Sequence, residues 1–432
     1  MSHGPWSMVH GPSRGRLLFH GLWTMVYGLV IAAPPAAAAV TAGVAKELFS
    51  LPPGVPLAGY SRRGGKPSRG QHDPLGVRAL VLADGDTAVA LVSCDLLIID
   101  ETLFEAARER LHAQGLPPDF VLLLAATHTH SGPGAYGRRF FEKISMGHFD
   151  PRVFEAIVDA VGRAVARAWQ SRAEVRLASA SGMTEGLVQN RVQPEGPVDA
   201  EVVVTGIYPA AGERPVAVLL SFAAHPTTLG AWNMELSGDY PAVAMREIER
   251  RIPSATALFF AGDAGDQAPV KSGDRFERPE RVGRAVADRA VALVNGLHPG
   301  PVPEVSARQE RMALPPAQLR IGHLRVPRWL SGRLVDDDAT LSVVTAGTTV
   351  LFGAPCDLAA GLGSRLKEAA RRRGLQAQVV GFACDYIGYC VPGTLYREKQ
   401  YESSMAFNGP KAGEQIADRL IRMLDQIADP KR

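Results

Sequence analysis

VLLLAATHTHSGPG, residues 121–134, is the stretch that decides the fold class of this 432-residue chain. Its first half, Val121 to Ala126, is an apolar run typical of a buried β-strand, and the glycines and proline at its end force a turn. His128 and His130 stand where the strand ends. Because alternate residues of an extended segment face the same way, we expect both imidazoles to converge on one point.

Four other predicted strands also run into loops with polar side chains. These strands are Val216–Ala223, Ala257–Ala261, Thr345–Phe352 and Gln376–Phe382. The loops after them carry, in turn, His225; Asp263 and Asp266; Cys356 and Asp357; and Asp385, Tyr386 and Tyr389. The carboxyl ends of strands are where α/β sheets bind ligands. We therefore expect the five loops to form one site.

Apolar runs alternate with longer amphipathic stretches along the whole body of the chain. This rhythm predicts the α/β class, with mixed sheets flanked by helices and an active site at the carboxyl ends of the strands. Two further strands are expected at Arg78–Leu82 and Ala88–Ser93. The predicted helices are Glu101–Gln114, Pro151–Gln170, Tyr240–Arg251, Pro279–Asn295, Leu358–Arg373 and Ala412–Gln426.

Composition and charge exclude several classes of protein. The apolar fraction is 46% and the charged fraction 21%, which is ordinary for a folded chain and unlike a disordered one. The formal net charge is only +3, from 47 basic and 44 acidic residues. Such a balance supplies no basic face of the kind that nucleic acid requires, so we expect no nucleic-acid partner.

The first 39 residues have the composition of an export signal. Arg14 and Arg16 precede an apolar run from Leu17 to Ala33, and three alanines at 37–39 offer a cleavage site. The alternative is an N-terminal membrane anchor, because the run is close to the shortest length that spans a bilayer. Residues 40–432 then form the mature catalytic domain, exported to a periplasmic or secreted location. Its four cysteines match no CxxC zinc pattern, although one disulfide would be compatible with export.

Histidines and a carboxylate that converge in this way are a typical zinc-binding set. Each element alone also has a structural interpretation. A single histidine such as His225 is more often a buried or capping residue, and the run Gly262–Asp266 is more often a turn whose aspartates bond their own backbone. The recurrence of these residues at strand ends favours the metal site.

The motif Thr127–Gly134 resembles the most recognisable stretch of the neutral/alkaline, non-lysosomal ceramidases. These are zinc amidohydrolases that split the N-acyl bond of ceramide. Other stretches are similar to motifs of the same family, in the same order: Asn190-Arg191 ahead of Gly196-Pro197-Val198-Asp199, Ser237-Gly238-Asp239, and Tyr389 through Tyr401-Glu402. The resemblance extends from about Val44 to Pro410 and concerns the family's N-terminal catalytic domain.

The resemblance assigns a role to each matching residue. It implies that the Zn²⁺ ligands are His128, His225, Asp357 and Tyr389. It places His130 and Tyr401 in catalysis, His130 as the group that transfers protons and Tyr401 as the phenol that faces the substrate carbonyl. Residues that it implies to bind the substrate or to support the site are Asp95, Asn190, Arg191, Asp239 and Asp266.

The sequence departs from the family pattern at three points. Asp357 stands where the family has glutamate, so the shorter carboxylate must lie closer to the metal or yield its role to Cys356. Ala268 replaces a serine of the family motif, which excludes a step that depends on that hydroxyl. We also expect no C-terminal immunoglobulin-like domain, because the sequence finishes in a helix at about Gln426.

These observations predict a zinc-dependent hydrolase of N-acyl amides with a lipid-like substrate and peripheral contact with a membrane. The oligomeric state is left open. Three alternatives stay open too. The chain is a zinc esterase or amidase for another substrate, a catalytically inactive relative that still binds metal, or a structural protein without metal.

Overall fold

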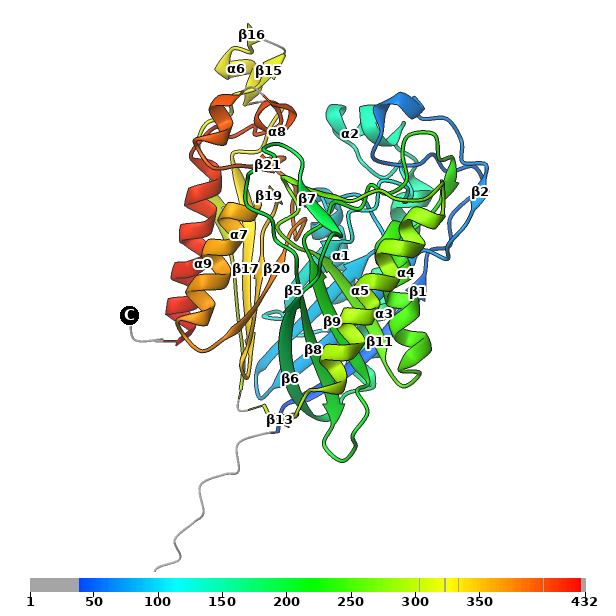
Figure 1. The fold of residues 1–432 in the computed structure, drawn as a ribbon, viewed down its shortest axis with the longest axis vertical. Coiled ribbons are helices and arrows are strands. Elements are labelled where there is room, and N and C mark those ends of the chain that lie inside the picture. The colour runs from blue at the N-terminus through cyan, green and yellow to red at the C-terminus, as the bar shows by residue number, and fades with distance from the viewer. Residues whose placement is uncertain (1–38, 303, 322–323, 333, 399, 429–432) are drawn as a thin grey trace, which may run out of the picture. The chain divides into compact units, whose positions relative to one another are not determined.

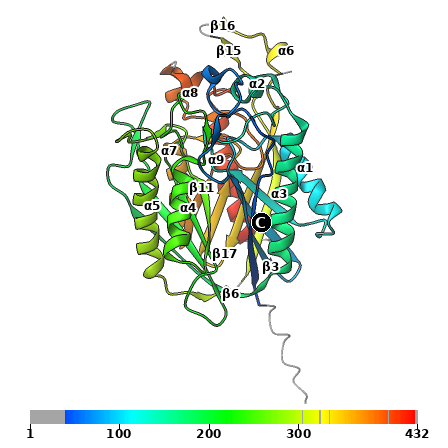
Figure 2. The same ribbon diagram turned by 90° about the vertical axis from the view of Figure 1, so that its right-hand side faces the viewer.

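The chain folds into four layers in a computed structural model, which describes residues 39–302, 304–321, 324–332, 334–398 and 400–428 (Figure 1). One outer layer consists of the helices α1 (Glu101–Ala113), α3 (Pro151–Gln170), α4 (Asp239–Arg251) and α5 (Glu277–Asn295). Two sheets follow, and α7 (Ala360–Arg371) and α9 (Ala412–Ala428) cover the far side of the second sheet. Figure 2 shows α4 and α5 side by side over one part of the first sheet and α3, next to α1, over another.

The larger sheet contains nine strands, and eight of them follow the order β11-β9-β8-β6-β1-β3-β4-β5. Their bounds are β1 Thr41–Leu48, β3 Gly76–Asp84, β4 Thr87–Cys94, β5 Val121–Ala126, β6 Ala173–Met183, β8 Glu201–Pro209, β9 Ala217–Phe222 and β11 Thr256–Ala261. The short β13 (Gly300–Pro301) pairs with β6. Only the pairs β11–β9 and β4–β5, at the two ends of this order, are parallel. The sheet is therefore mixed, as predicted.

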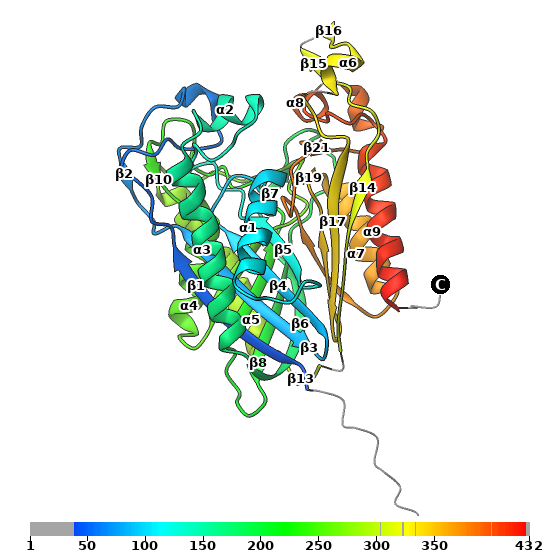
Figure 3. The ribbon, with the colours of Figure 1, turned by 180° about the vertical axis from the view of Figure 1, so that it is seen from behind.

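The smaller sheet has the order β14-β17-β18-β20. Its strands are β14 Val305–Ala313, β17 Asp338–Ala346, β18 Thr349–Gly353 and β20 Gln376–Val380. It packs face to face on the larger sheet, and the Gln378 amide of β20 donates a hydrogen bond of 2.9 Å to the Thr205 hydroxyl of β8. Figure 3 shows the same two sheets from behind, with α9 against β14 and β17.

Helix α3 illustrates how local sequence sets an element. The Asp150 side chain accepts a hydrogen bond from the Arg152 backbone N–H, and Pro151 occupies the first turn, where its missing N–H leaves no bond unmade. Val153, Ile157 and Val161 then bury one face against β1 and β3. These signals give the helix the predicted bounds, residues 151–170.

The predicted strand Thr345–Phe352 is wrong as a single strand. The chain turns back within it, so that β17 and β18 form an antiparallel hairpin. Gly347 has φ +56° in the turn, a left-handed conformation that glycine adopts without a steric penalty. The apolar run continues through the turn, and the periodicity therefore did not reveal the reversal.

Short elements gather at the end of the sheets where β5, β9, β11 and β20 finish (Figure 1). They include η1 Ser61–Arg63, α2 Phe140–Met146, α6 Arg328–Ser331, β19 Asp357–Leu358, β21 Tyr389–Cys390 and α8 Tyr401–Ser404. The export signal predicted for residues 1–39 lies outside the described residues except for Ala39. Within the described ranges, every helix is too short or too polar to cross a membrane. All four cysteines are buried free thiols.

Candidate metal centre and active-site pocket

His128 follows β5 in an unusual backbone conformation. Its φ is +63°, in the left-handed region, so the segment after Ala126 is a turn and not an extended strand. His128 and His130 do converge, but the expected reason, alternation along an extended strand, is wrong. The rings meet because the turn brings them together. Phe382 stacks on the His128 ring with centroids 3.7 Å apart and holds it in place.

Three imidazoles converge on one point. The Nε2 atoms of His128 and His225 lie 2.9 Å apart, and His130 Nε2 lies 3.2 Å from each of them. His128 Nδ1 faces the Leu97 carbonyl at 2.6 Å, and His225 Nδ1 faces the Ala264 carbonyl at 3.2 Å. A carbonyl only accepts, so both Nδ1 atoms carry the proton and both Nε2 atoms point a lone pair at the shared centre.

Burial keeps these imidazoles neutral. It lowers the pKa of His128 to about 3 and shifts the pKa of His130 and His225 well below the usual value. His130 Nδ1 is buried without a hydrogen-bond partner. Gly59 packs against it with φ +102°, and a Cβ there would lie 2.7 Å from that nitrogen, so only glycine fits.

Asp357 places a carboxylate beside the histidines. It is fully buried, and its Oδ1 lacks a hydrogen-bond partner while lying 3.7 Å from His128 Nε2. Its Oδ2 accepts a hydrogen bond of 2.7 Å from the Tyr386 hydroxyl. Burial raises the pKa of Asp357 to about 7. Cys356, the alternative ligand from the sequence, packs instead in the apolar core of the smaller sheet.

Tyr389 and Tyr401 line the same space. β19 pairs with β21 in the register that sets Asp357 opposite Tyr389. The guanidinium of Arg191 donates to the Tyr389 hydroxyl at 2.9 Å, and its Nε forms an ion pair of 2.9 Å with Glu402. Tyr401 packs edge-on against Tyr389 with ring centroids 5.7 Å apart, and its side chain is largely exposed.

The remaining predicted residues support the loops and do not line the cavity. Asn190 donates to Asp266 Oδ2 at 3.1 Å, and Asp266 Oδ1 accepts from the first backbone N–H of α7 at 2.9 Å. Asp95 accepts from the Gly76 N–H. Asp239 accepts from the Leu229 N–H and the Thr228 hydroxyl, in the loop after His225.

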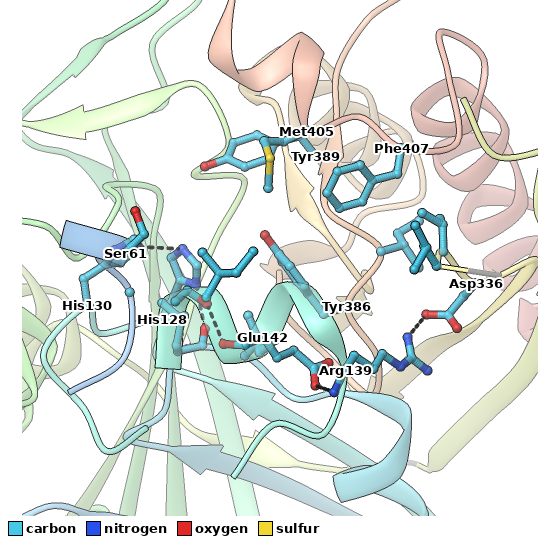
Figure 4. Close-up of a pocket in the computed structure, with 18 of the residues that line it drawn as sticks. Ser61, His128, His130, Arg139, Glu142, Asp336, Tyr386, Tyr389, Met405 and Phe407 are labelled. Carbon is cyan, nitrogen blue, oxygen red and sulfur yellow. Dashed lines mark hydrogen bonds and ion pairs between the residues drawn. The ribbon is translucent and has the colours of Figure 1, made fainter. Parts of the chain in front are cut away.

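A cavity of about 320 Å³ opens over the histidines (Figure 4). Of the predicted site residues, His128, His130, Tyr389 and Tyr401 line it. Most of the other lining side chains are apolar: Leu97, Ile98, Ile144, Leu334, Val335, Ile387, Met405 and Phe407. The site therefore combines a polar, nitrogen-rich floor with walls that suit hydrocarbon.

Sequence reasoning missed several residues of this site. Tyr386 holds Asp357, and Phe382 holds His128, yet neither had been assigned a role. Tyr386 could have been found, because it lies in a strand-end loop three positions before Tyr389. The sequence predicts Phe382 as the last residue of a strand, and no sequence pattern indicates its φ of +56°. Arg139 and Glu142 of the cavity wall come from a region without a predicted element.

The residues present fit a divalent metal ion. His128, His130 and His225 form a cluster that could hold one. Zinc–nitrogen bonds of about 2.0–2.1 Å at tetrahedral angles set bound nitrogens about 3.3 Å apart. The Nε2 lone pairs of His128 and His225 face each other beside an unpaired carboxylate oxygen, and they repel unless a cation lies among them.

Comparison with known proteins points to one family. The family model described as neutral/alkaline non-lysosomal ceramidase, N-terminal, matches residues 51–275. A neutral ceramidase of Mycobacterium tuberculosis is 27% identical over 280 residues, which cover 56% of this chain and 44% of that protein. A neutral ceramidase of Pseudomonas aeruginosa is 29% identical over 233 residues, which cover 50% of this chain and 34% of that protein. The matched segments thus span less than half the length of these curated relatives.

Solved structures share the fold over most of the chain. The crystal structure of neutral ceramidase from Pseudomonas aeruginosa matches with a TM-score of 0.80 at 21% identity, over 91% of this chain and 75% of that one. A ceramidase complexed with C2 matches with the same TM-score at 20% identity, over 91% and 76%. The family match contains all three histidines, whereas Asp357 and Tyr389 lie beyond residue 275.

Proposed function

Because this chain belongs to the neutral/alkaline non-lysosomal ceramidase family, we propose that it hydrolyses N-acyl amide bonds of lipid-like substrates, ceramide first among them. The observation that carries the proposal is the convergence of three neutral imidazoles and an unpaired carboxylate oxygen at the floor of an apolar cavity. Relatives described as neutral ceramidases support the substrate class.

Zinc is the proposed cofactor, held by His128, His225, Asp357 and Tyr389. Bound there, zinc supplies Lewis acidity that activates water and polarises a carbonyl. His130 takes a proton from the attacking water and delivers it to the departing amine nitrogen. Its imidazole suits this work because Nε2 faces the centre and Nδ1 has no competing partner.

Tyr401 is proposed to hold the substrate carbonyl, with Tyr389 and Arg191 positioning it. Arg191 fixes the Tyr389 hydroxyl at 2.9 Å, and Tyr401 packs on the Tyr389 ring at the cavity edge. The Tyr401 O–H then donates to the negative oxygen that develops as the amide is attacked. The apolar walls exclude water and align the chain of the substrate.

One experiment separates the proposal from its alternatives. The chain is purified, its metal content is measured, and N-acyl hydrolysis is assayed with and without a chelator. Zinc with chelator-sensitive turnover is the expected result. Zinc without turnover on any lipid amide or ester would identify an inactive metal-binding relative. Absence of metal would contradict both.

Ala268 favours a second candidate, a zinc amidase or esterase for another acyl compound. It lies on β12 (Gln267–Pro269), whose Gln267 carbonyl accepts from the His225 N–H, and it offers no hydroxyl there. The variant Ala268→Ser decides between the two substrates. If the serine alone brings strong ceramide cleavage, the natural substrate is a different acyl compound. Unchanged, efficient ceramide cleavage by the native chain supports ceramide.

Contact with a lipid surface is proposed for the end of the molecule that carries the cavity. Five side chains there are apolar and more than a third exposed: Phe140, Ile144, Trp329, Leu334 and Tyr401. They come from α2, α6, α8 and the segment before β17, which lie at the same end (Figure 1). The double variant Phe140→Ser, Ile144→Ser should lower the fraction of protein that co-sediments with phospholipid vesicles. Leu48→Ser on β1 should leave that fraction unchanged.

Export is proposed from Arg14, Arg16 and the apolar run from Leu17 to Ala33. N-terminal sequencing of the chain recovered outside the cytoplasm tests it. A mature N-terminus near Ala39 is expected. An intact N-terminus in the membrane fraction would identify an anchor instead.

A further inference from the structure

We propose that the ion pair between Arg139 and Asp336 closes one end of the active-site cavity and sets the longest acyl chain that the site accepts. The proposal rests on the function proposed above and adds the residues that select the substrate by length. Figure 4 shows the pair at the far side of the cavity from His128 and His130.

Two separate spaces meet at this ion pair. The inner cavity, about 320 Å³, contains the histidine floor, and the outer pocket, about 420 Å³, opens beside Phe140 and Asp337. The walls that the two spaces share are Arg139, Leu334, Val335 and Asp336. The two spaces become continuous once this barrier opens.

The pair joins two segments that are far apart in the sequence. Arg139 immediately precedes α2, and Asp336 belongs to the segment between α6 and β17. One Arg139 nitrogen binds the Asp336 carboxylate, and the other lies 3.3 Å from Glu101 Oε2. The guanidinium therefore spans the space between α2 and the opposite segment and is held on both sides.

The charges of Arg139 and Asp336 disfavour contact with a hydrocarbon chain. An acyl chain that runs from the histidines along Ile98, Ile387 and Phe407 meets apolar walls until it reaches the charged groups. A methylene placed against Arg139 and Asp336 would remove water from both charges without replacing it. A chain that fits the inner cavity gains from burial, whereas a longer chain must displace the pair.

Opening the pair does not require unfolding. Arg139 is 31% exposed and Asp336 21% exposed, so water reaches both charged groups when the pair opens. The remaining walls shared by the two spaces, Leu334 and Val335, are apolar and suit a hydrocarbon chain. Removal of the charged barrier therefore extends the cavity.

The test compares acyl chains of increasing length, from acetyl to stearoyl, on one amine. In the native chain, kcat/KM should rise by about fourfold for each methylene that is buried and then stop rising. Arg139→Ala should move that plateau to longer chains. Arg311→Ala is the matched control, because Arg311 also pairs with Glu101 and lines neither space.

A plateau at the same length in the Arg139→Ala and Arg311→Ala variants would overturn the proposal. Asp336→Asn, which keeps the size of the side chain, provides a second variant if Arg139→Ala does not fold. Calorimetric binding of the same series of fatty acids gives a readout without turnover. If no variant hydrolyses any amide, the proposed function fails, and the fatty-acid profile still decides whether the pair limits chain length.

Discussion

His128, His130 and His225 occupy similar positions around one centre, yet their surroundings differ. His128 and His225 each have an Nδ1 tied to a backbone carbonyl, which fixes the ring and the tautomer as in many metal sites. His130 Nδ1 has no such partner among the described residues. The free ring nitrogen favours a histidine that gains and loses a proton.

This difference predicts distinct effects of two substitutions. His128→Ala should abolish both metal binding and hydrolysis. His130→Gln should retain the metal while kcat falls by about 10²–10⁴-fold, the usual contribution of a general base. Elemental analysis and steady-state kinetics on the two variants check this, with exposed His112→Gln as the control. Equal metal loss in His130→Gln would instead make His130 a ligand.

Tyr386 should matter through Asp357. Its hydroxyl donates to Asp357 Oδ2 at 2.7 Å, so Tyr386→Phe leaves a buried carboxylate oxygen without a donor. We expect metal affinity to fall by about 10–100-fold, as for other residues that orient a ligand. Competition with a chromophoric chelator measures the affinity. Tyr208→Phe is the control, because the Tyr208 hydroxyl bonds the Val294 backbone carbonyl and not a residue of the site. This variant should leave the metal affinity unchanged.

At the residue scale, the sequence predicted which side chains meet but not how. Residue chemistry placed His128, His225 and Asp357 among the candidates, because all three follow apolar runs, and the family resemblance selected them as ligands. The left-handed φ of His128 and of Phe382 could not be predicted, because tertiary contacts impose these conformations and neither residue type favours them.

At the scale of elements, a buried cluster of charged residues links α7 to the start of β8. Lys367 of α7 is 6% exposed and contacts the carboxylates of Asp199 and Glu201. Burial and the neighbouring Asp199 raise the pKa of Asp263 well above its usual value. Asp263 precedes Ala264, whose carbonyl holds His225, so the cluster also supports the metal centre.

Removal of the lysine should destabilise the protein strongly. Lys367→Met leaves the buried Asp199 carboxylate without a cation, whereas Glu201 keeps Arg371. Loss of the partner of a buried charge typically costs about 3–5 kcal/mol of folding free energy. Chemical denaturation measures it. Arg365→Met, on the same helix but in an exposed pair with Asp418, should cost within about 1 kcal/mol. Similar losses for the two variants would contradict this account.

Glu142 of α2 predicts a pH dependence of stability. Burial and the nearby Asp100 raise the pKa of Glu142 from 4.5 to about 7. The folded chain therefore binds more protons than the unfolded chain between these values, and this stabilisation is lost as the pH rises through about 7. Glu142→Gln should flatten that part of a plot of Tm against pH. Exposed Glu109→Gln should leave the plot unchanged, and an unaltered plot in Glu142→Gln would count against a buried, protonated Glu142.

Helices were easier to predict than strands. α3 has a cap, a proline and a regular apolar face, and the sequence predicted its bounds. β6 and β14 were missed because they mix charged and small residues and face partly to water, which weakens the alternation. Their pairing depends on residues far away in the sequence, so no local pattern identifies it.

At the scale of the whole molecule, the candidate metal centre lies between the two sheets. His128 and His225 follow β5 and β9 of the larger sheet, whereas Asp357 follows β18 of the smaller one. A bound ion would therefore join the two sheets as well as serve the reaction.

Chelation should accordingly lower the thermal stability. Saturation at a thousandfold excess over Kd contributes about 4 kcal/mol, so the chelator should reduce Tm by several degrees. Scanning calorimetry with and without chelator checks this. The His128→Ala variant should melt at one temperature in both conditions. A native chain that is indifferent to the chelator would argue against a resident metal.

The division of the centre between two sheets also sets an order in time. Ribosomes make chains from the N-terminus, and domains fold as their segments emerge. His128 and His225 are therefore synthesised before Phe382, which holds the His128 ring, and before Asp357, Tyr386 and Tyr389. A nascent chain has the imidazoles of the floor but not the carboxylate and phenols that complete the wall. The candidate metal centre, and with it the activity proposed above, is therefore complete only after residue 389 has been made.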